Sequence, residues 1–267
     1  MSAVALERRL RAEGLDWIVP RLADQAHLRA LVTTRAGGVS TGEYGSMNLA
    51  RHSGDDPRAV AENRRRLEAF LPSPPIWLEQ VHGVAVAVLD RVAPTARIIA
   101  DGAVTRTPGI VVAVQTADCL PVLFADRNGT AVGIAHAGWR GLAAGVLEAT
   151  VSALHALGVA AQDVNAWIGP GIGQRAFEVG ADVHAAFCER DPASAAAFVP
   201  VRPGKWQADL YALARARLAI AGVGAVTGGS FCTHDEPARF FSYRRSPQSG
   251  RMASLVWLER DTQTLYV

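Results

Sequence analysis

The sequence predicts an α+β protein in which strands and helices mix without a strict βαβ rhythm. The chain has 267 residues, of which 49% are hydrophobic and 19% charged. This composition supports a large buried core and argues against extensive disorder. Layered folds of this length are common as single domains, and no internal repeat or low-complexity linker interrupts the chain. We therefore expect residues 1–267 to form one domain.

Six apolar runs that contain β-branched residues predict strands. Polar or glycine-containing segments separate them, so each run is short enough to be a strand of a globular domain. The predicted strands are Val84–Leu89, Ile110–Val114, Pro121–Phe124, Ala131–Ala135, Val164–Ile168 and Ala253–Leu258.

Apolar residues at helical spacing predict helices in the Ala-rich segments 141–157, 181–198 and 208–221. The first of these closes on Gly158, a suitable C-terminal cap. A further helix is expected over residues 58–70, with Asp56 as N-cap and Pro57 at the first helical position.

Charge and hydropathy argue against two classes of partner. The formal net charge is +2, and the basic clusters Arg64–Arg66 and Arg244–Arg245 are too short to form the basic stripe that duplex binding needs. The most apolar stretch, residues 109–125, is interrupted by Gln115, Asp118 and Pro121, so we expect no membrane-spanning helix. Neither nucleic acid nor a membrane is an expected partner.

The N-terminus and the cysteines predict a cytoplasmic protein. Charged residues directly follow a four-residue apolar run at the N-terminus, a pattern unlike a signal peptide. Cys119, Cys188 and Cys232 are the three cysteines, a sparse and odd number that suits thiols in a reducing compartment. The sequence does not indicate an oligomeric state.

Polar residues interrupt the predicted strands at three places. Gln80 and His82 directly precede a strand, Asp118 and Cys119 fall between two strands, and His136 ends another. Each has an ordinary structural interpretation, because a cysteine in an apolar run is commonly a small buried side chain and a strand-end histidine is commonly hydrogen-bonded. A buried aspartate beside the cysteine is nevertheless costly unless it is paired.

If His82, Cys119 and His136 converge, two imidazoles and a thiolate would supply three metal ligands. This set leaves tetrahedral zinc an open position, as in catalytic sites. The intervals of 37 and 17 residues match no zinc-finger, ribbon or HExxH spacing, so the residues alone leave the metal site and the ordinary interpretation both open.

The same residues lie in segments that resemble the YfiH/YlmD family, whose members have been described as laccase-domain polyphenol oxidases, purine nucleoside phosphorylases with adenosine deaminase activity, and peptidoglycan editing factors. The similarity runs in order from about residue 31 to 258. Its segments are TTRAGGVSTGEYGSMNLA (33–50), Asp55–Arg65 with its ENRRR, EQVHG (79–83), ADGAVT (100–105), QTADCLPVLFAD (115–126), AHAGWRGLAAG (135–145), IGPGIG (168–173), FEVG (177–180) and FSYRR (241–245).

This resemblance implies an α/β/β/α layered sandwich akin to the cysteine-hydrolase fold of the cytotoxic necrotising factors. It also implies one zinc ion bound by the residues that match His82, Cys119 and His136, with copper as a possible occupant of the same site. The sequence departs from many relatives at Gly171 and Arg175, where those relatives carry cysteines that are not metal ligands.

The implied function is a zinc-dependent purine nucleoside phosphorylase with adenosine deaminase activity. Phosphorolysis would convert adenosine, inosine, guanosine or methylthioadenosine and phosphate to the base and a pentose 1-phosphate. Deamination would use water activated by zinc to attack C6 of adenosine. Cys119, Asp118 and His136 are the expected catalytic residues.

Substrate contacts are expected from four further positions. Arg35, with the backbone amides of Gly37 and Gly38, is the candidate phosphate cradle, helped by Arg244. Asn48 and Gln80 are expected to contact substrate hydroxyls or a base edge. Aromatic side chains that could stack on a purine are Trp139 and Phe241–Tyr243.

Three other functions stay open at this stage. Copper in the same site could oxidise phenols, although seven histidines in the chain cannot supply the sites of a multicopper laccase. Zinc hydroxide, or Cys119 activated by His136, could hydrolyse an amide of a cell-wall precursor. A structural zinc would need a fourth protein ligand, which is not evident. The other histidines are expected on surfaces or helices, with two flanking the motifs: His52 and His234.

Overall fold

The computed structural model describes residues 2–23, 25, 27–90 and 97–260. Its α-helices are α1 Ala3–Ala12, α2 Pro57–Glu68, α3 Trp139–Ala144, α4 Val146–Ala156, α5 Ala181–Cys188 and α6 Leu210–Ile220. Its 3-10 helices are η1 Gly42–Tyr44, η2 Ala161–Asp163, η3 Gln174–Ala176 and η4 Pro192–Ala197. Its strands are β1 Leu28–Val32, β2 Ile76–Trp77, β3 Val86–Val88, β4 Gly102–Thr105, β5 Val111–Thr116, β6 Leu120–Asp126, β7 Val132–Ala137, β8 Val164–Ile168, β9 Glu178–Val179, β10 Phe198–Arg202, β11 Lys205–Ala208, β12 Ala225–Gly228 and β13 Met252–Leu258.

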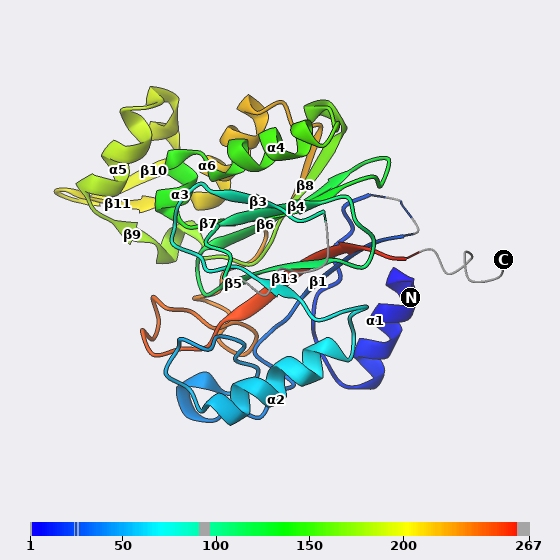
Figure 1. The fold of residues 1–267 in the computed structure, drawn as a ribbon. Helices are drawn as coiled ribbons and strands as arrows, with labels where there is room; N and C mark the ends of the chain where they lie inside the picture. The colour runs from blue at the N-terminus through cyan, green and yellow to red at the C-terminus, as the bar shows by residue number, and fades with distance from the viewer. Residues whose placement is uncertain (1, 24, 26, 91–96, 261–267) are drawn as a thin grey trace.

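These strands form a four-stranded sheet, a six-stranded sheet and a small three-stranded sheet. The four-stranded sheet has the order β1-β13-β5-β2, and the six-stranded sheet has the order β12-β8-β6-β7-β4-β3. The central pairs of both are antiparallel, whereas β2 with β5, β3 with β4 and β12 with β8 are parallel. The small sheet, β10-β11-β9, lies at the end of the molecule next to α5 (Figure 1).

The two large sheets pack face to face because side chains alternate along each strand. In β5, Val112 and Val114 lie in the core between the sheets, while Val111 and Ala113 lie in a second core under α1 and α2. In β6, Leu123 likewise belongs to the core between the sheets. Figure 1 shows the resulting order of helices, sheet, sheet and helices.

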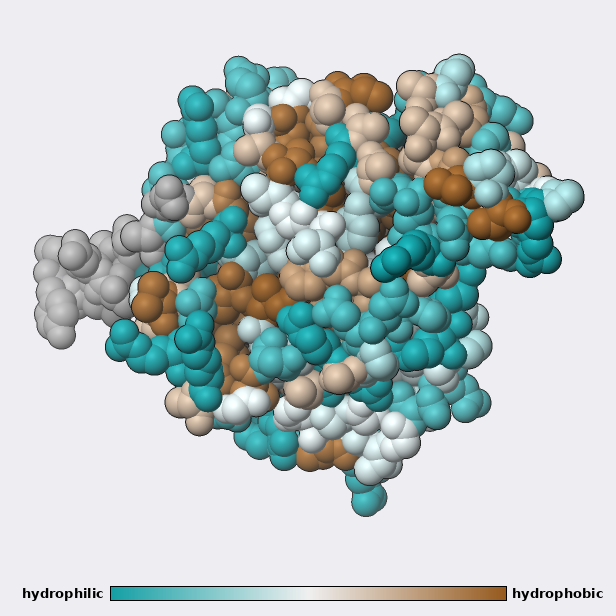
Figure 2. Space-filling model, turned by 180° about the vertical axis from the view of Figure 1, so that it is seen from behind, coloured by the Kyte–Doolittle hydropathy of each residue, from teal (hydrophilic) through white to brown (hydrophobic). Residues whose placement is uncertain are grey.

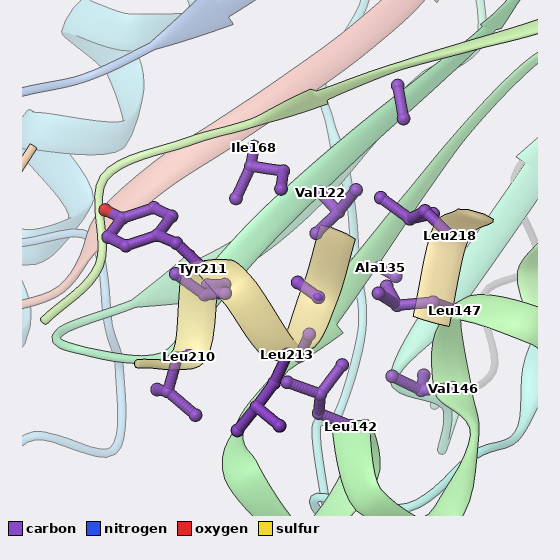
Figure 3. Packing of buried hydrophobic residues seen from close by; sticks show 14 of the residues in the cluster. Val122, Ala135, Leu142, Val146, Leu147, Ile168, Leu210, Tyr211, Leu213 and Leu218 are labelled. Carbon is purple, nitrogen blue, oxygen red and sulfur yellow. The ribbon is translucent and has the colours of Figure 1, made fainter. Parts of the chain in front are cut away.

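A third core fills the space between the six-stranded sheet and the helices α3 to α6. Figure 3 shows Leu210, Leu213 and Leu218 of α6 in one cluster with the sheet residues Val122 and Ile168. All five are at most 2% exposed. This packing fixes α3 and α6, whose first residues border the site described below.

The predicted α+β class is confirmed, and each of the six predicted strands corresponds to an observed strand: β3, β5, β6, β7, β8 and β13. The helix over residues 58–70 is also observed as α2, where the Asp56 carboxylate accepts a hydrogen bond from Arg58 N and Pro57 occupies the first turn. Strands that were not predicted include β1, β4 and the β10–β11 hairpin.

Two predicted helices differ from the observed ones. The segment 141–157 is not one helix, because Gly145 adopts φ +109° and separates α3 from α4. A left-handed residue cannot continue a right-handed helix, and glycine adopts this conformation with little cost. The segment 181–198 is helical only to Cys188, since Asp191 and Pro192 begin a 3-10 helix. The helix predicted at 208–221 is α6, capped by Asp209.

The surface shows no single dominant apolar face in the view from behind, where hydrophobic residues form separate patches between hydrophilic ones (Figure 2). Among the helices of the described residues, none combines the length and hydrophobicity that a bilayer span requires.

Candidate metal centre and cavity

Three segments meet where the chain passes from the four-stranded sheet to the six-stranded sheet. His82 lies in the connection between β2 and β3, Cys119 in the short turn between β5 and β6, and His136 near the end of β7. Their donor atoms all lie within 4.8 Å of one another. His82 Nε2 is 3.8 Å from Cys119 Sγ, and the two imidazole rings meet edge to face with centroids 4.7 Å apart. The tertiary structure thus brings the three predicted ligands together.

Asp101 orients two of these three residues. Its Oδ1 lies 2.8 Å from His136 Nδ1, which leaves the opposite ring nitrogen, Nε2, for the site. The same carboxylate accepts hydrogen bonds from the backbone amides of Val81, His82 and Gly83. His82 has φ +61°, a conformation that non-glycine residues rarely adopt. The three amide contacts hold the turn in that conformation.

Asp101 was not among the predicted site residues. It is fully buried and directly precedes β4. A buried carboxylate needs hydrogen-bond donors or a positive charge, so a charged residue at the start of an apolar strand was the available signal. Carboxylate–histidine pairs of this kind fix the tautomer and ring orientation of metal-binding histidines.

The electrostatics favour a thiolate between two imidazoles. Burial opposes a charge on Cys119, but His136 and His82 outweigh burial and lower the pKa of the thiol to about 6. Burial likewise opposes a charge on His136, yet Cys119 and Asp101 raise the pKa of its imidazole to about 9. For Asp101, the hydrogen bonds from His136 and the backbone amides overcome burial and hold the pKa below its usual range.

This donor set fits a divalent transition metal. Ligands at the usual zinc distances are about 3.5 Å apart in a tetrahedral site, close to the observed 3.8 Å between His82 Nε2 and Cys119 Sγ. Gly138 leaves the necessary room, because a Cβ atom there would lie 2.7 Å from His82 Cδ2 and 3.0 Å from Cys119 Sγ. Two imidazoles and a thiolate suit zinc or copper.

All three candidate ligands line a cavity of about 980 Å³. The cavity has the volume of a small-molecule site. Two carboxylate side chains, Glu79 and Asp118, line it together with six arginines: Arg51, Arg64, Arg97, Arg140, Arg244 and Arg251. Its aromatic lining residues are Trp77, Trp139, Phe177 and Tyr243. The cavity therefore offers both cationic groups and aromatic faces beside the candidate metal centre.

Three further predicted residues line this cavity: Asp118, Gln80 and Arg244. Asp118, with φ +89°, accepts hydrogen bonds from Thr233 Oγ1 and from Arg244 N, each at 2.6 Å. Gln80 pairs both ends of its amide with the backbone of Gln115. Arg244 stacks on Phe177 and donates a hydrogen bond to Glu178 O.

Arg35 and Asn48 are not brought to the cavity. The Arg35 guanidinium donates to Gly45 O and Pro237 O and lies over the Phe241 ring. The Gly38 amide, expected in the phosphate cradle, donates to Ser46 Oγ instead. These contacts hold the loop after β1, so the structure does not support a phosphate cradle at Arg35.

Asn48 is fully buried, and its hydrogen bonds also stabilise this loop region. Its Oδ1 accepts hydrogen bonds from the backbone amides of Ala50 and Arg251, and its Nδ2 donates to Ser53 Oγ and Asp55 Oδ2. A side chain with every polar atom paired has no group free for a substrate. The structure therefore does not support the expected substrate contact.

Of the other aromatic residues and histidines that the sequence marked as candidates, some line the cavity and others lie outside it. Trp139 and Tyr243 line the cavity, whereas Phe241 is 1% exposed and belongs to a small core cluster. His52 lines the cavity, but His234 pairs with Asp235 outside it.

Comparison with known proteins identifies the family. A family model described as multi-copper polyphenol oxidoreductase laccase matches residues 29–259. The chain belongs to this family. A purine nucleoside phosphorylase of Pseudomonas aeruginosa is 54% identical over 244 residues, which cover 91% of this chain and 98% of that protein. Purine nucleoside phosphorylase YfiH of Escherichia coli is 52% identical over 243 residues, covering 90% and 98%.

Solved structures show the same relationship. A Neisseria meningitidis protein superposes with a TM-score of 0.87 at 48% identity, covering 92% of this chain and all of that one. YlmD from Geobacillus stearothermophilus superposes with a TM-score of 0.83 at 31% identity, covering 90% and 100%. The resemblance to the YfiH/YlmD family is thereby confirmed.

Proposed function

We propose that this protein is a zinc-dependent purine nucleoside phosphorylase that also deaminates adenosine. The observation that carries the proposal is one cavity that contains the His82–Cys119–His136 cluster, cationic side chains and aromatic faces. Phosphorolysis requires a nucleoside and a phosphate anion to bind together. Aromatic faces suit the base of the nucleoside, and cationic side chains suit the anion. The names of the Pseudomonas and Escherichia relatives, both purine nucleoside phosphorylases, support it.

In this proposal His82, Cys119 and His136 hold the metal, and Asp101 fixes the orientation of His136. Zinc bound there would supply a Lewis acid and activate water near neutral pH. Cys119 Sγ lies within 4.8 Å of a donor nitrogen of each imidazole, which supports a role as ligand over that of a free nucleophile. Asp118 is proposed to position Arg244 at the cavity, since its Oδ2 accepts a hydrogen bond from Arg244 N while Thr233 Oγ1 holds its Oδ1.

The purine is proposed to stack on Trp139, which is half-buried, or on Tyr243, which is exposed, because both line the cavity. Gln80 and Arg244 are proposed to border the nucleoside, because both line the cavity next to the metal centre. Adenosine, inosine, guanosine and methylthioadenosine all carry the planar base and pentose that this lining would accept.

Chromatography of nucleoside reactions tests the function directly. Purified protein of known metal content is incubated with adenosine or inosine, with and without phosphate. We expect phosphate-dependent release of the base and phosphate-independent conversion of adenosine to inosine. Cys119→Ala should abolish both, whereas Cys188→Ala, a thiol outside the cavity, should retain both. If fully metallated protein gives no product, purine chemistry at this site is refuted.

Copper chemistry is a second candidate, because two imidazoles and a thiolate also suit copper and the family model carries a laccase description. Protein loaded with copper should then oxidise a phenol while zinc-loaded protein does not.

Hydrolysis of an amide in a cell-wall precursor at the same centre is the third candidate, and release of an amino acid from such a precursor would identify it.

We further propose that residues 1–267 act as one domain of the layered sandwich type related to the cytotoxic necrotising factors. The three cores share the strands of the two stacked sheets, which supports one folding unit. A cytoplasmic location is proposed as well, since the three cysteines are free thiols and Cys119 must stay reduced to bind a metal.

A further inference from the structure

One wall of the cavity gathers four basic side chains: Arg51, His52, Arg64 and Arg251. Leu49, just before Arg51 and His52 in the chain, links them: its amide donates to Arg251 O at 3.3 Å, and its carbonyl accepts from Arg64 Nε at 2.9 Å. Burial, then Arg251 and Arg64, lower the pKa of His52. Burial, then Arg51, lower the pKa of Arg64 to about 10. The four groups form the cationic wall.

Arg64 is fixed in place before any ligand binds. It is 8% exposed and projects from α2, its Nε donates to Leu49 O at 2.9 Å, and its guanidinium lies 4.2 Å from the centre of the Trp77 ring. In the described part of the chain, its two Nη groups have no hydrogen-bond partner. A rigid guanidinium with free donors suits an oxyanion, because its fork matches the spacing of phosphate oxygens.

Arg251 connects this wall to the candidate metal centre. Its Nη1 donates to Ser249 O and Gly250 O, and its backbone amide is held by Asn48 Oδ1. Arg251 lines the same cavity as Cys119 and Asp118. An anion bound at Arg251 would therefore lie in the cavity that also contains the candidate metal ligand Cys119.

The arginines of this wall have no direct carboxylate partner in the described part of the chain. Among the described residues, none of Arg51, Arg64 and Arg251 forms an ion pair with a carboxylate. Clustered like charges destabilise a folded protein unless a counter-charge is present. The arrangement is explained if an anion supplies that charge.

We propose that the cationic wall is an oxyanion subsite that binds inorganic phosphate beside the metal centre. The role of this phosphate as co-substrate rests on the proposed phosphorylase function, whereas its binding does not. In the reaction, a phosphate oxygen forms a bond to C1′ of the pentose while the bond from C1′ to the purine nitrogen breaks. The electron pair of that bond and a proton go to the purine, and a pentose 1-phosphate remains.

Direct phosphate binding provides the first test, because it needs no catalysis. Inorganic phosphate should raise the melting temperature of the wild-type holoprotein, and titration calorimetry should give a single site. In Arg51→Gln and Arg251→Met we expect phosphate affinity to fall about tenfold or more, the range for loss of a charged hydrogen bond. Arg51 is exposed, so its replacement should not prevent folding.

Arg65→Gln is the matched control. Arg65 neighbours Arg64 on α2 but is exposed, pairs with Glu62 and does not line the cavity. This variant should bind phosphate like the wild type. Unchanged phosphate affinity in both cavity variants, or no phosphate binding by the wild type, would overturn the subsite.

Kinetics separate the subsite from the proposed function. If phosphorolysis occurs, the KM for phosphate should rise in the two cavity variants more than the KM for inosine. If the wild type binds phosphate through these arginines but performs no phosphorolysis, the subsite stands and the proposed function fails. A nucleoside 5′-monophosphate that binds through the same arginines far more tightly than phosphate would instead assign the wall to an esterified phosphate and overturn the proposal.

Discussion

Asp101 lies 2.8 Å from Nδ1 of His136 and, through the same carboxylate, binds the backbone of the turn that carries His82. One buried side chain thus sets the positions of two imidazoles that are separated by more than fifty residues in the sequence. Metal affinity should depend on this carboxylate even though it is not itself a ligand.

Asp101→Asn should weaken metal binding about 10- to 100-fold, the usual effect of losing a carboxylate that orients a metal-binding histidine. Competition with a chromophoric chelator measures the affinity. Asp126→Asn is the control, because Asp126 is equally buried at the end of β6 but binds only the turn residues Asn128 and Thr130. Equal metal affinity in wild type and Asp101→Asn would contradict the role of Asp101.

Gly138→Ala should reduce metal content without a large loss of folding stability. The backbone of Gly138 has φ −66°, which alanine adopts readily, but the new Cβ would collide with His82 and Cys119. Metal analysis of purified protein measures the loss. Gly173→Ala, where a Cβ would approach only Cys232, should keep its metal, so parallel loss in both variants would argue against a local steric effect.

Cys119 of metal-free protein should react with iodoacetamide over a lower pH range than an ordinary thiol. The thiolate is the reactive form and exists above the pKa, which the two imidazoles lower to about 6 despite burial. Peptide mass spectrometry across about pH 5 to pH 9 should place the rise in rate near pH 6, well below the value of about 8.5 for a free cysteine.

Cys188 provides the internal comparison in the same samples. Burial and Asp191 raise its pKa, so its alkylation should begin only at higher pH. Restoring the metal should protect Cys119 and leave Cys188 unchanged. A common pH profile for both thiols would show that the imidazoles do not act on Cys119 as inferred.

Gly145→Ala should destabilise the protein by about 1–2 kcal/mol, the cost of a left-handed conformation for a residue with a Cβ atom. Gly145 has φ +109° and separates α3 from α4. Urea unfolding monitored by circular dichroism measures the change. Unaltered stability would mean that α3 and α4 can join without strain, contrary to the observed break.

The sequence was informative where local physics decides the outcome. Hydrophobic runs predicted six strands, and Asp56 with Pro57 predicted the start of α2, because caps and alternation act over a few residues. The strand-end positions of His82, Cys119 and His136 also marked the candidate ligands. The spacing of these residues did not show that they share one site. The resemblance to the family implied it.

Motifs were less informative about the roles of individual polar residues. Arg35 and Asn48 lie in a motif of the family, yet they bind loop backbone away from the cavity. Arg64 and Arg251 line the cavity, although one belongs to a surface helix and the other precedes a strand. The difference depends on which side of each loop or helix faces the cavity, and this is set by packing partners distant in the sequence.

The sequence by itself therefore determined the class of fold, most of the central strands, the family and the three candidate ligands. The tertiary structure alone decided that Asp101 orients His136, that Arg64 and Arg251 share a wall, and that Arg35 does not reach the cavity. The physical reason is the range of the forces involved. Propensity, capping and alternation act between neighbours, whereas the pairing of β1 with β13 joins residues more than two hundred positions apart and fixes which polar groups meet.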